Sequence, residues 1–217
     1  MFKLIERMFF LMKFRDLPST LPLYVGDGTI LLPRAQLPVL FKAQEDKELI
    51  DYAFRKGHRL IGLLQTNPDG GHFQTGCVGK IMNFQDGPYI FVTFRGICRF
   101  DIREILEGSP IKKASVSYEG YKIDLDDPQT DPFVDRSRLL NLLKTYLEDQ
   151  EIMANWDEIN HASNELIISS LSMACPFKPI EKQALLESSS LSERCDIMMA
   201  LMEFSSPHLK GEQPVLH

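Results

Sequence analysis

The sequence predicts an α+β protein in which a β-rich part precedes a helical part. Short runs of alternating apolar and polar residues, separated by glycine turns, extend over residues 58–123, whereas residues 135–205 carry apolar stripes at helical spacing. The charge also changes along the chain. Residues 1–123 hold 17 Lys and Arg against 13 Asp and Glu, and residues 124–217 hold 7 against 17. A mildly basic part and a strongly acidic part indicate two units with different surfaces.

Residues 21–41 combine many apolar side chains with three prolines. Two apolar runs, residues 21–25 and 29–32, lie on either side of the turn Gly26-Asp27-Gly28. Proline lacks a backbone donor and is therefore found at strand starts and sheet edges. The pattern predicts a hairpin of edge strands.

The following residues predict one helix and a series of strands. Asp46 is placed to cap a helix over 46–56, whose apolar residues share one face. Strands are expected over 58–65, 76–84, 89–95, 98–103 and 111–123. Short strands with glycine turns and a single helix predict a small β-barrel or a rolled sheet.

The second part of the chain is predicted to be helical throughout. Its expected helices cover 135–150, the surroundings of Trp156, 163–174, a segment that starts at Pro179 and ends near 188–190, and a last segment after Ser190. Ser190 and Glu193 have the spacing of a capping box for that last helix.

The predicted organisation has five parts. They are an N-terminal arm (1–19), a β-rich subdomain (20–123), a linker (124–134), a helical subdomain (135–205) and a tail (206–217). The linker is expected because its residues are acidic, interrupted by prolines and without periodicity. A calcium-binding loop from Asp124 to Asp135 is an alternative. However, the glycine that such a loop requires is missing, and Asp135 replaces its terminal Glu.

Neither a secretory signal nor a membrane span is recognisable. The longest apolar run near the N-terminus covers residues 8–12, which is too short for either. The chain has four cysteines, Cys77, Cys98, Cys175 and Cys195. They show neither a CxxC spacing nor a histidine at metal-ligand spacing, so we expect reduced, buried thiols in a cytoplasmic protein without a membrane partner.

No motif for catalysis, cofactor binding or metal binding is present. The nearest candidate for a phosphate loop is Gly79-Lys80, but Gln74 stands in place of the first glycine. A GxSxG elbow and an HExxH helix are both missing. We therefore expect no cofactor, no metal and no catalytic residue. A hydrolase with an unrecognised site stays an alternative.

Five short motifs in a fixed order carry a family resemblance. They are LPL at 21–23, LLPRAQLP at 31–38, HRLIGLLQ at 58–65, GCVGKI at 76–81 and FRGICRFDI at 94–102. In this order they resemble the N-terminal substrate-binding domain of Lon proteases. SLSMACPF at 170–177, followed by EKQALLE at 181–187, resembles the helical part of stand-alone bacterial members that lack the ATPase and protease modules. The resemblance implies a PUA-like β pseudo-barrel followed by a C-terminal helical bundle. The chain departs from the family at 41–47, where FKAQEDK replaces a segment similar to Phe-Glu-Pro-Arg-Tyr.

The resemblance also implies a function. A non-catalytic module is expected to bind unfolded or partly folded polypeptides in protein quality control, with a separate protease as a possible partner. Candidate peptide contacts are Phe41, as apolar area, and Arg95 and Arg99, which would orient carboxyl or carbonyl groups. The alternative for the two arginines is a solvated strand face with ion pairs to Asp101 or Glu104. RNA binding, as in other PUA-like domains, is the alternative function. The dispersed basic residues and the acidic net charge argue against it.

Overall fold

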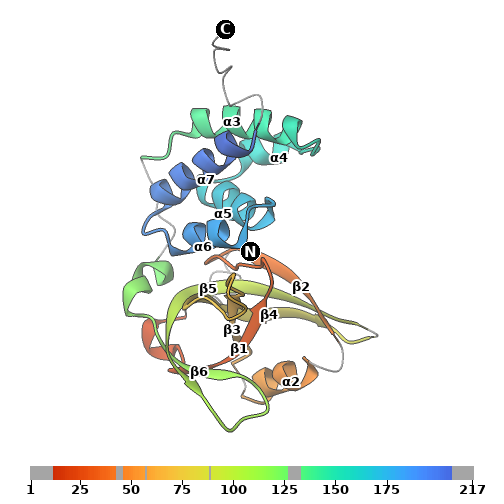
Figure 1. The fold of residues 1–217 in the computed structure, drawn as a ribbon, viewed down its shortest axis with the longest axis vertical. Helices are drawn as coiled ribbons and strands as arrows, with labels where there is room; N and C mark the ends of the chain where they lie inside the picture. The colour runs from red at the N-terminus through yellow and green to blue at the C-terminus, as the bar shows by residue number, and fades with distance from the viewer. Residues whose placement is uncertain (1–11, 43–45, 57, 88, 127–132, 207–217) are drawn as a thin grey trace, which may run out of the picture. The chain divides into compact units, whose positions relative to one another are not determined.

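The structure, a computed structural model, describes residues 12–42, 46–56, 58–87, 89–126 and 133–206. The chain divides into two compact units, residues 1–127 and 128–217 (Figure 1). The first unit is built on a mixed sheet and the second on helices, so the predicted α+β class is correct. The division falls at Asp127, within the acidic segment where the sequence changes character.

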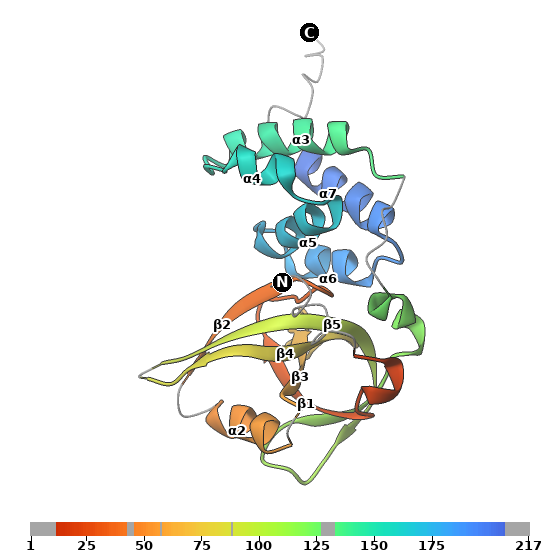
Figure 2. The ribbon, with the colours of Figure 1, turned by 180° about the vertical axis from the view of Figure 1, so that it is seen from behind.

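The first unit is a six-stranded sheet that closes on itself (Figures 1 and 2). Its strands are β1 (Thr20–Gly26), β2 (Gln36–Lys42), β3 (Leu60–Gln65), β4 (Thr75–Gln85), β5 (Tyr89–Leu106) and β6 (Lys113–Ser117). Their order is β2-β5-β4-β3-β1-β6, and β6 pairs again with β5. Because β5 has 18 residues, its first part pairs with β2 and β4 while its last part reaches β6. The long strand therefore closes the barrel.

Large apolar side chains fill the barrel. All six residues of β3 are buried, which matches their almost uninterrupted apolar sequence. One cluster of core residues gathers side chains from β1, β3, β4, β5 and β6, among them Leu21, Leu60, Val78, Phe100 and Val116. Core side chains from five strands thus meet in one interior, as expected for a closed sheet.

The predicted hairpin over residues 21–41 is wrong. β1 pairs in parallel with β3 and antiparallel with β6, whereas β2 pairs with β5. The second apolar run, residues 29–32, lies outside the strands; Ile30, Leu31 and Leu32 are nevertheless buried. The chain then turns at Arg34, whose φ of 64° is left-handed. A buried apolar segment outside the sheet has the same composition as a strand. The sequence pattern alone therefore did not distinguish such a segment from a strand.

Gly96 does not separate two strands but lies inside β5. A Cβ atom at this position would lie 2.0 Å from the carbonyl oxygen of Leu32. The glycine therefore allows residues 32–33 to cross close against the strand, and Pro33 forms an isolated bridge with it. The strand predicted over 111–123 is also shorter. It ends at Ser117 and is followed by the 3-10 helix η2 (Glu119–Leu125).

Helix α2 (Lys47–Arg55) follows the predicted span closely. Asp46 is the N-cap residue, although its side chain makes no capping hydrogen bond. Residues 12–19 of the predicted arm belong to the first unit: η1 (Phe14–Asp16) precedes Leu17 in the core, and the Tyr118 hydroxyl donates to the carbonyl of Pro18 over 2.7 Å. Residues 1–11 lie outside the described part of the chain.

The second unit contains helices at every predicted position. They are α3 (Arg136–Asp149), α4 (Trp156–His161), α5 (Asn164–Ala174), α6 (Pro179–Glu187) and α7 (Leu191–Ser205). Asp135, Asn155, Ser163 and Ser190 each accept a hydrogen bond from a backbone N–H group of the first turn. The apolar stripes meet in a core that includes Leu139, Tyr146, Ile168, Leu185 and Met198. These local signals explain why the helices were predictable.

The start of α7 has one contact beyond the expected capping box. The Ser190 hydroxyl accepts from the N–H of Glu193 over 3.1 Å, as predicted. The Glu193 carboxylate accepts in addition from the backbone N–H of Ser189 over 2.6 Å. Ser189 also donates its hydroxyl to this carboxylate, so two groups of one residue help to hold the Glu193 side chain at the start of the helix.

Candidate functional site

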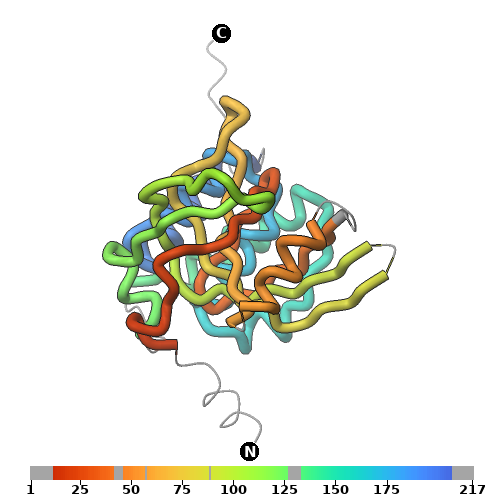
Figure 3. The backbone as a smooth tube through the Cα atoms, turned by 90° about the horizontal axis from the view of Figure 1, so that it is seen from below, coloured from red at the N-terminus to blue at the C-terminus, as the bar shows by residue number. Residues whose placement is uncertain are grey.

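Three strands of the first unit, β2, β5 and β4, form the part of the barrel that ends in the β4–β5 hairpin (Figures 2 and 3). Along the first part of β5, buried and exposed positions alternate. Ile90, Val92 and Phe94 are fully buried, and Tyr89 and Phe91 are exposed. The pairing register places Leu40 of β2 opposite Phe91 and Pro38 opposite Thr93. One side of these strands therefore covers the core and the other is exposed.

We call the second side the outer face. It consists of the outward positions Gln36, Pro38 and Leu40 of β2, Tyr89, Phe91, Thr93 and Arg95 of β5, and Lys80, Asn83 and Gln85 of β4. Its three large apolar side chains are well exposed, with 51% for Leu40, 48% for Phe91 and 63% for Tyr89. A cluster of this kind on a surface is typical of an interaction site.

β2 also offers an unpaired edge. Among the strands of the described chain, only β5 pairs with β2. The N–H of Gly96 donates to the carbonyl of Ala35, which fixes the alternation of the ladder. Accordingly, the backbone groups of Leu37, Val39 and Phe41 point toward β5, and those of Gln36, Pro38 and Leu40 point away from it. Pro38 removes one outward donor, as is usual for an edge strand.

The outer face is cationic at the end away from the hairpin. Lys80, Arg95 and Gln36 lie side by side in one row across β4, β5 and β2. Two rows further toward the hairpin, Gln85, Phe91 and Leu40 form the apolar end. None of the outward positions named above carries Asp or Glu.

Phe41, a predicted peptide contact, lies on the core side of β2. Its side chain is 1% exposed, and its ring packs edge-on against Tyr24 and Phe94 at centroid distances of 4.7 and 5.9 Å. In this position it anchors β2 against the core. Its side chain therefore does not contribute to the outer face.

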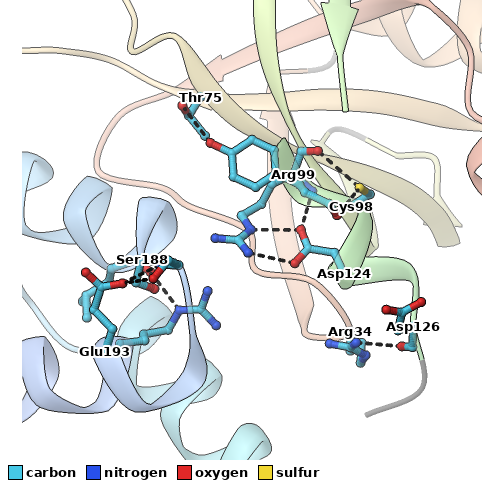
Figure 4. A network of polar contacts seen from close by, with 12 residues as sticks. Arg34, Thr75, Cys98, Arg99, Asp124, Asp126, Ser188 and Glu193 are labelled. Atoms are coloured by element: carbon cyan, nitrogen blue, oxygen red, sulfur yellow. Dashed lines mark hydrogen bonds and ion pairs between the residues drawn. The ribbon is translucent and has the colours of Figure 1, made fainter. Parts of the chain in front are cut away.

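Arg99 is buried in a different part of the barrel, and its expected surface pairing is wrong. Its Nε donates to Oδ2 of Asp124 and its Nη2 to Oδ1, both over 2.9 Å, and its backbone N–H also donates to Oδ2 over 2.9 Å (Figure 4). The guanidinium stacks over the Tyr121 ring at 4.6 Å. Burial lowers the pKa of Arg99, but the hydrogen bond and charge of Asp124 act in the opposite direction. The pKa is raised on balance, so the side chain stays charged.

This ion pair joins η2 to β5. Asp124 was predicted to begin the linker, but it belongs to η2 and is buried. Its carboxylate is engaged by Arg99, which also argues against the calcium-loop alternative. Neighbouring polar groups are paired as well: the Asp101 carboxylate accepts from the hydroxyls of Thr75 and Tyr121 over 2.8 and 3.2 Å. Arg99 and Asp124 hold the barrel together rather than forming an open site.

The cysteines are buried, as predicted. Burial raises the pKa of Cys98 to about 12 and that of Cys175 to about 11, so both are protonated thiols at neutral pH. In the part of the chain that the structure describes, no group of three or more His, Cys, Asp or Glu side chains is arranged to hold a metal ion. Within the same residues, no helix combines the length and apolar character of a membrane span.

The sequence reasoning missed the outer face, although a signal for it was present. In residues 89–94 the buried phase Ile90, Val92 and Phe94 alternates with Tyr89 and Phe91, so both sides of the strand are partly apolar. A strand that is covered on one side only has polar residues on the other. Apolar residues in the second phase therefore indicate an exposed apolar surface.

Comparisons with known proteins give the family. The family model of the ATP-dependent protease La (LON) substrate-binding domain matches residues 20–203. A Lon protease of Anaeromyxobacter dehalogenans is 26% identical over 214 residues, which is 90% of this chain and 24% of that protein. The chain thus spans about a quarter of the length of this relative.

Two solved structures share the fold. The Lon N-terminal domain protein from Xanthomonas campestris is 18% identical, with a TM-score of 0.60 over 84% of this chain and 98% of that one. The N-terminal domain of Mycobacterium avium complex Lon protease is also 18% identical, with a TM-score of 0.62 over 84% of this chain and 97% of that one. The matched residues of the family model include both the barrel and nearly all of the helical unit. The chain belongs to the family of LON substrate-binding domains.

Proposed function

We propose that this chain is a non-catalytic module that binds extended apolar segments of unfolded or partly folded polypeptides. The observation that carries the proposal is the edge of β2 that no other strand of the described residues pairs with, beside the exposed side chains of Leu40 and Phe91. A bound segment would add a strand at the edge through main-chain hydrogen bonds and place alternate side chains on the outer face. Membership of the LON substrate-binding family supports the same function.

The expected affinity is modest. Covering three side chains that are about half exposed contributes roughly 2–4 kcal/mol, and each main-chain hydrogen bond adds about 0.5–1.5 kcal/mol. The loss of rigid-body freedom on association offsets several kcal/mol of this sum. Binding in the micromolar range follows, which suits transient capture. We further propose that the captured polypeptide is passed to a separate protease in protein quality control, since the curated relative is a Lon protease.

The test is to titrate the full chain with a fluorescently labelled, permanently unfolded model polypeptide and to record anisotropy. Two variants probe the site. Leu40→Pro removes the outward N–H of β2 without touching its ladder with β5, and Phe91→Ser removes apolar area from the outer face. Ile180→Ser is the matched control, because it removes a side chain that is 60% exposed from the helical unit.

We expect saturable binding at micromolar concentrations, a loss of at least fivefold for L40P and F91S, and unchanged binding for I180S. Thermal melts check that each variant is folded. A lack of saturation at tens of micromolar would overturn the proposal, as would equal losses for I180S and F91S.

A further inference from the structure

The edge of β2 presents a fixed set of backbone groups to an added strand. Gln36, Pro38 and Leu40 direct their backbone groups away from β5, because the residues between them make the ladder with it. The place of Pro38 agrees with this phase, since a proline at a ladder position would leave the strand without one hydrogen bond to β5. The edge therefore offers the N–H groups of Gln36 and Leu40 and the carbonyls of all three residues.

The same three residues also carry their side chains on the outer face. All three are exposed, and Phe91 lies opposite Leu40 on β5. In a pair of strands, residues that lie directly opposite each other have their side chains on one face of the sheet. Ligand residues opposite Gln36, Pro38 and Leu40 therefore face the apolar surface of Leu40 and Phe91, and the ligand residues between them face the other way.

The direction of the ligand decides which of its residues donate to β2. In antiparallel pairing, a ligand residue opposite an outward residue of β2 exchanges hydrogen bonds with it. In parallel pairing, the ligand residues on either side of the opposite one make these bonds. β2 pairs antiparallel with β5, and β5 pairs antiparallel with β4. Antiparallel pairing is also slightly more stable per residue than parallel pairing, so it is the direction that this part of the sheet favours.

We infer that the module binds its ligand antiparallel to β2, so that the same alternate residues of the ligand supply both the apolar side chains and the backbone donors. This inference rests on the proposed function and specifies its ligand. The matching segments carry apolar residues at every second position. The residues between them donate nothing to β2, so proline is accepted there and excluded from the apolar positions. The ligand carbonyl opposite Pro38 finds no donor on the edge.

The experiment uses fluorescently labelled peptides with a core of five residues. The first, third and fifth residues are apolar, and the second and fourth are threonine. Two forms of this peptide each lack two N–H groups through N-methylation, one at the first and third residues and the other at the second and fourth. The two forms are matched in composition and in the number of methyl groups. A slip of the peptide by two residues along β2 leaves the expected pattern unchanged.

N-methylation of the first and third residues is expected to weaken binding by about tenfold or more, because two hydrogen bonds to β2 are lost. N-methylation of the second and fourth residues is expected to change the affinity by less than about threefold, since these N–H groups point away from β2. The opposite pattern would place the ligand parallel to β2 and overturn the inference, as would equal losses for both forms. Either result leaves the proposed function intact, whereas no saturable binding of the unmodified peptide contradicts that function itself.

Pro38→Ala tests the edge from the side of the protein. It gives β2 a third outward N–H group without changing its ladder with β5, so the unmodified peptide is expected to bind about twofold to fivefold more tightly. Pro110→Ala is the control, because it removes an exposed proline between β5 and β6. Thermal melts check that both variants are folded. Unchanged affinity of P38A, or an equal gain for P110A, would overturn the inference. A dimer in solution that L40P dissociates would overturn it as well, since a second copy would then occupy the edge.

Discussion

The guanidinium of Arg99 and the carboxylate of Asp124 form a two-pronged ion pair in the barrel, 25 residues apart in sequence. Both side chains are more than 90% buried. Because the pair is desolvated, removing one partner leaves a charge without compensation. The pair therefore holds η2 against β5 only while both charged side chains are present.

Asp124→Asn is expected to destabilise the barrel by about 3–5 kcal/mol, since it leaves the buried guanidinium without a negative partner. Urea unfolding followed by circular dichroism measures the change. Glu203→Gln is the control, because the Arg138–Glu203 pair is also hydrogen-bonded, at 3.1 Å, but exposed, and its loss should cost less than about 1 kcal/mol. The double variant R99M/D124L is expected to recover most of the lost stability. Equal effects for D124N and E203Q would contradict the buried character of the pair.

Gly96→Ala is expected to cost about 3 kcal/mol or more, because the new Cβ atom would meet the backbone of Leu32 rather than a side chain that can move. Gly120→Ala is the matched control: it has no atom within 4 Å of the added carbon and an ordinary φ. Thermal melts of both variants give the comparison. A G96A protein as stable as G120A would show that residues 32–33 do not press against β5.

The thiols are expected to resist alkylation in the folded protein. Burial holds the pKa of Cys98 at about 12 and that of Cys175 at about 11, above the usual 9.0, so little thiolate forms at pH 8. Iodoacetamide labelling followed by mass spectrometry should modify these cysteines only after denaturation. Rapid labelling of Cys98 in the native chain would contradict its burial.

The same pKa shifts predict a loss of stability in alkali. A thiol whose pKa is higher in the folded than in the unfolded state stabilises the fold fully below the unfolded pKa. This contribution is lost as the pH rises from about 9 through about 12 for Cys98. Urea midpoints measured from pH 8 to pH 11 should therefore fall, and Cys98→Ala should flatten the slope. A slope that this substitution leaves unchanged would assign the effect to other groups.

Ser163→Ala is expected to destabilise the helical unit by about 1 kcal/mol, because the serine hydroxyl accepts from the N–H of Leu166 at the start of α5. Ser170→Ala, at an exposed position within the same helix, is the control and should be neutral or slightly stabilising. Fluorescence of Trp156, the single tryptophan, reports this unit directly. If S163A and S170A unfold at the same urea concentration, the cap contributes nothing.

The sequence predicted the positions of helices and strands better than it predicted which of them contact one another. Helix α5 was recognised from Ser163 and its apolar stripe, because capping and periodicity are local. The neighbours of β1 were not, since its alternation is satisfied equally by a hairpin with the next apolar run or by pairing with distant strands. Asp124 was assigned to the linker for the same reason: its acidic, proline-containing surroundings dominate the composition, and its partner Arg99 lies 25 residues earlier in the chain.

The three candidate peptide contacts do not lie on one surface. The register places Arg95 on the outer face, while Phe41 and Arg99 are buried, and only pairing register decides which phase of a strand is covered.

The pairing of Thr20 with Ser115 has a consequence for synthesis on the ribosome. The first strand of the barrel is made about 95 residues before its second neighbour, so for that time one side of β1 lacks a partner. At about 5–20 residues per second this interval lasts roughly 5–20 s. The barrel closes only once β6 has emerged, by which time translation has reached the helical unit. A nascent chain of this protein therefore passes through a stage in which it carries an open sheet edge of its own, the same kind of surface that it is proposed to recognise in others.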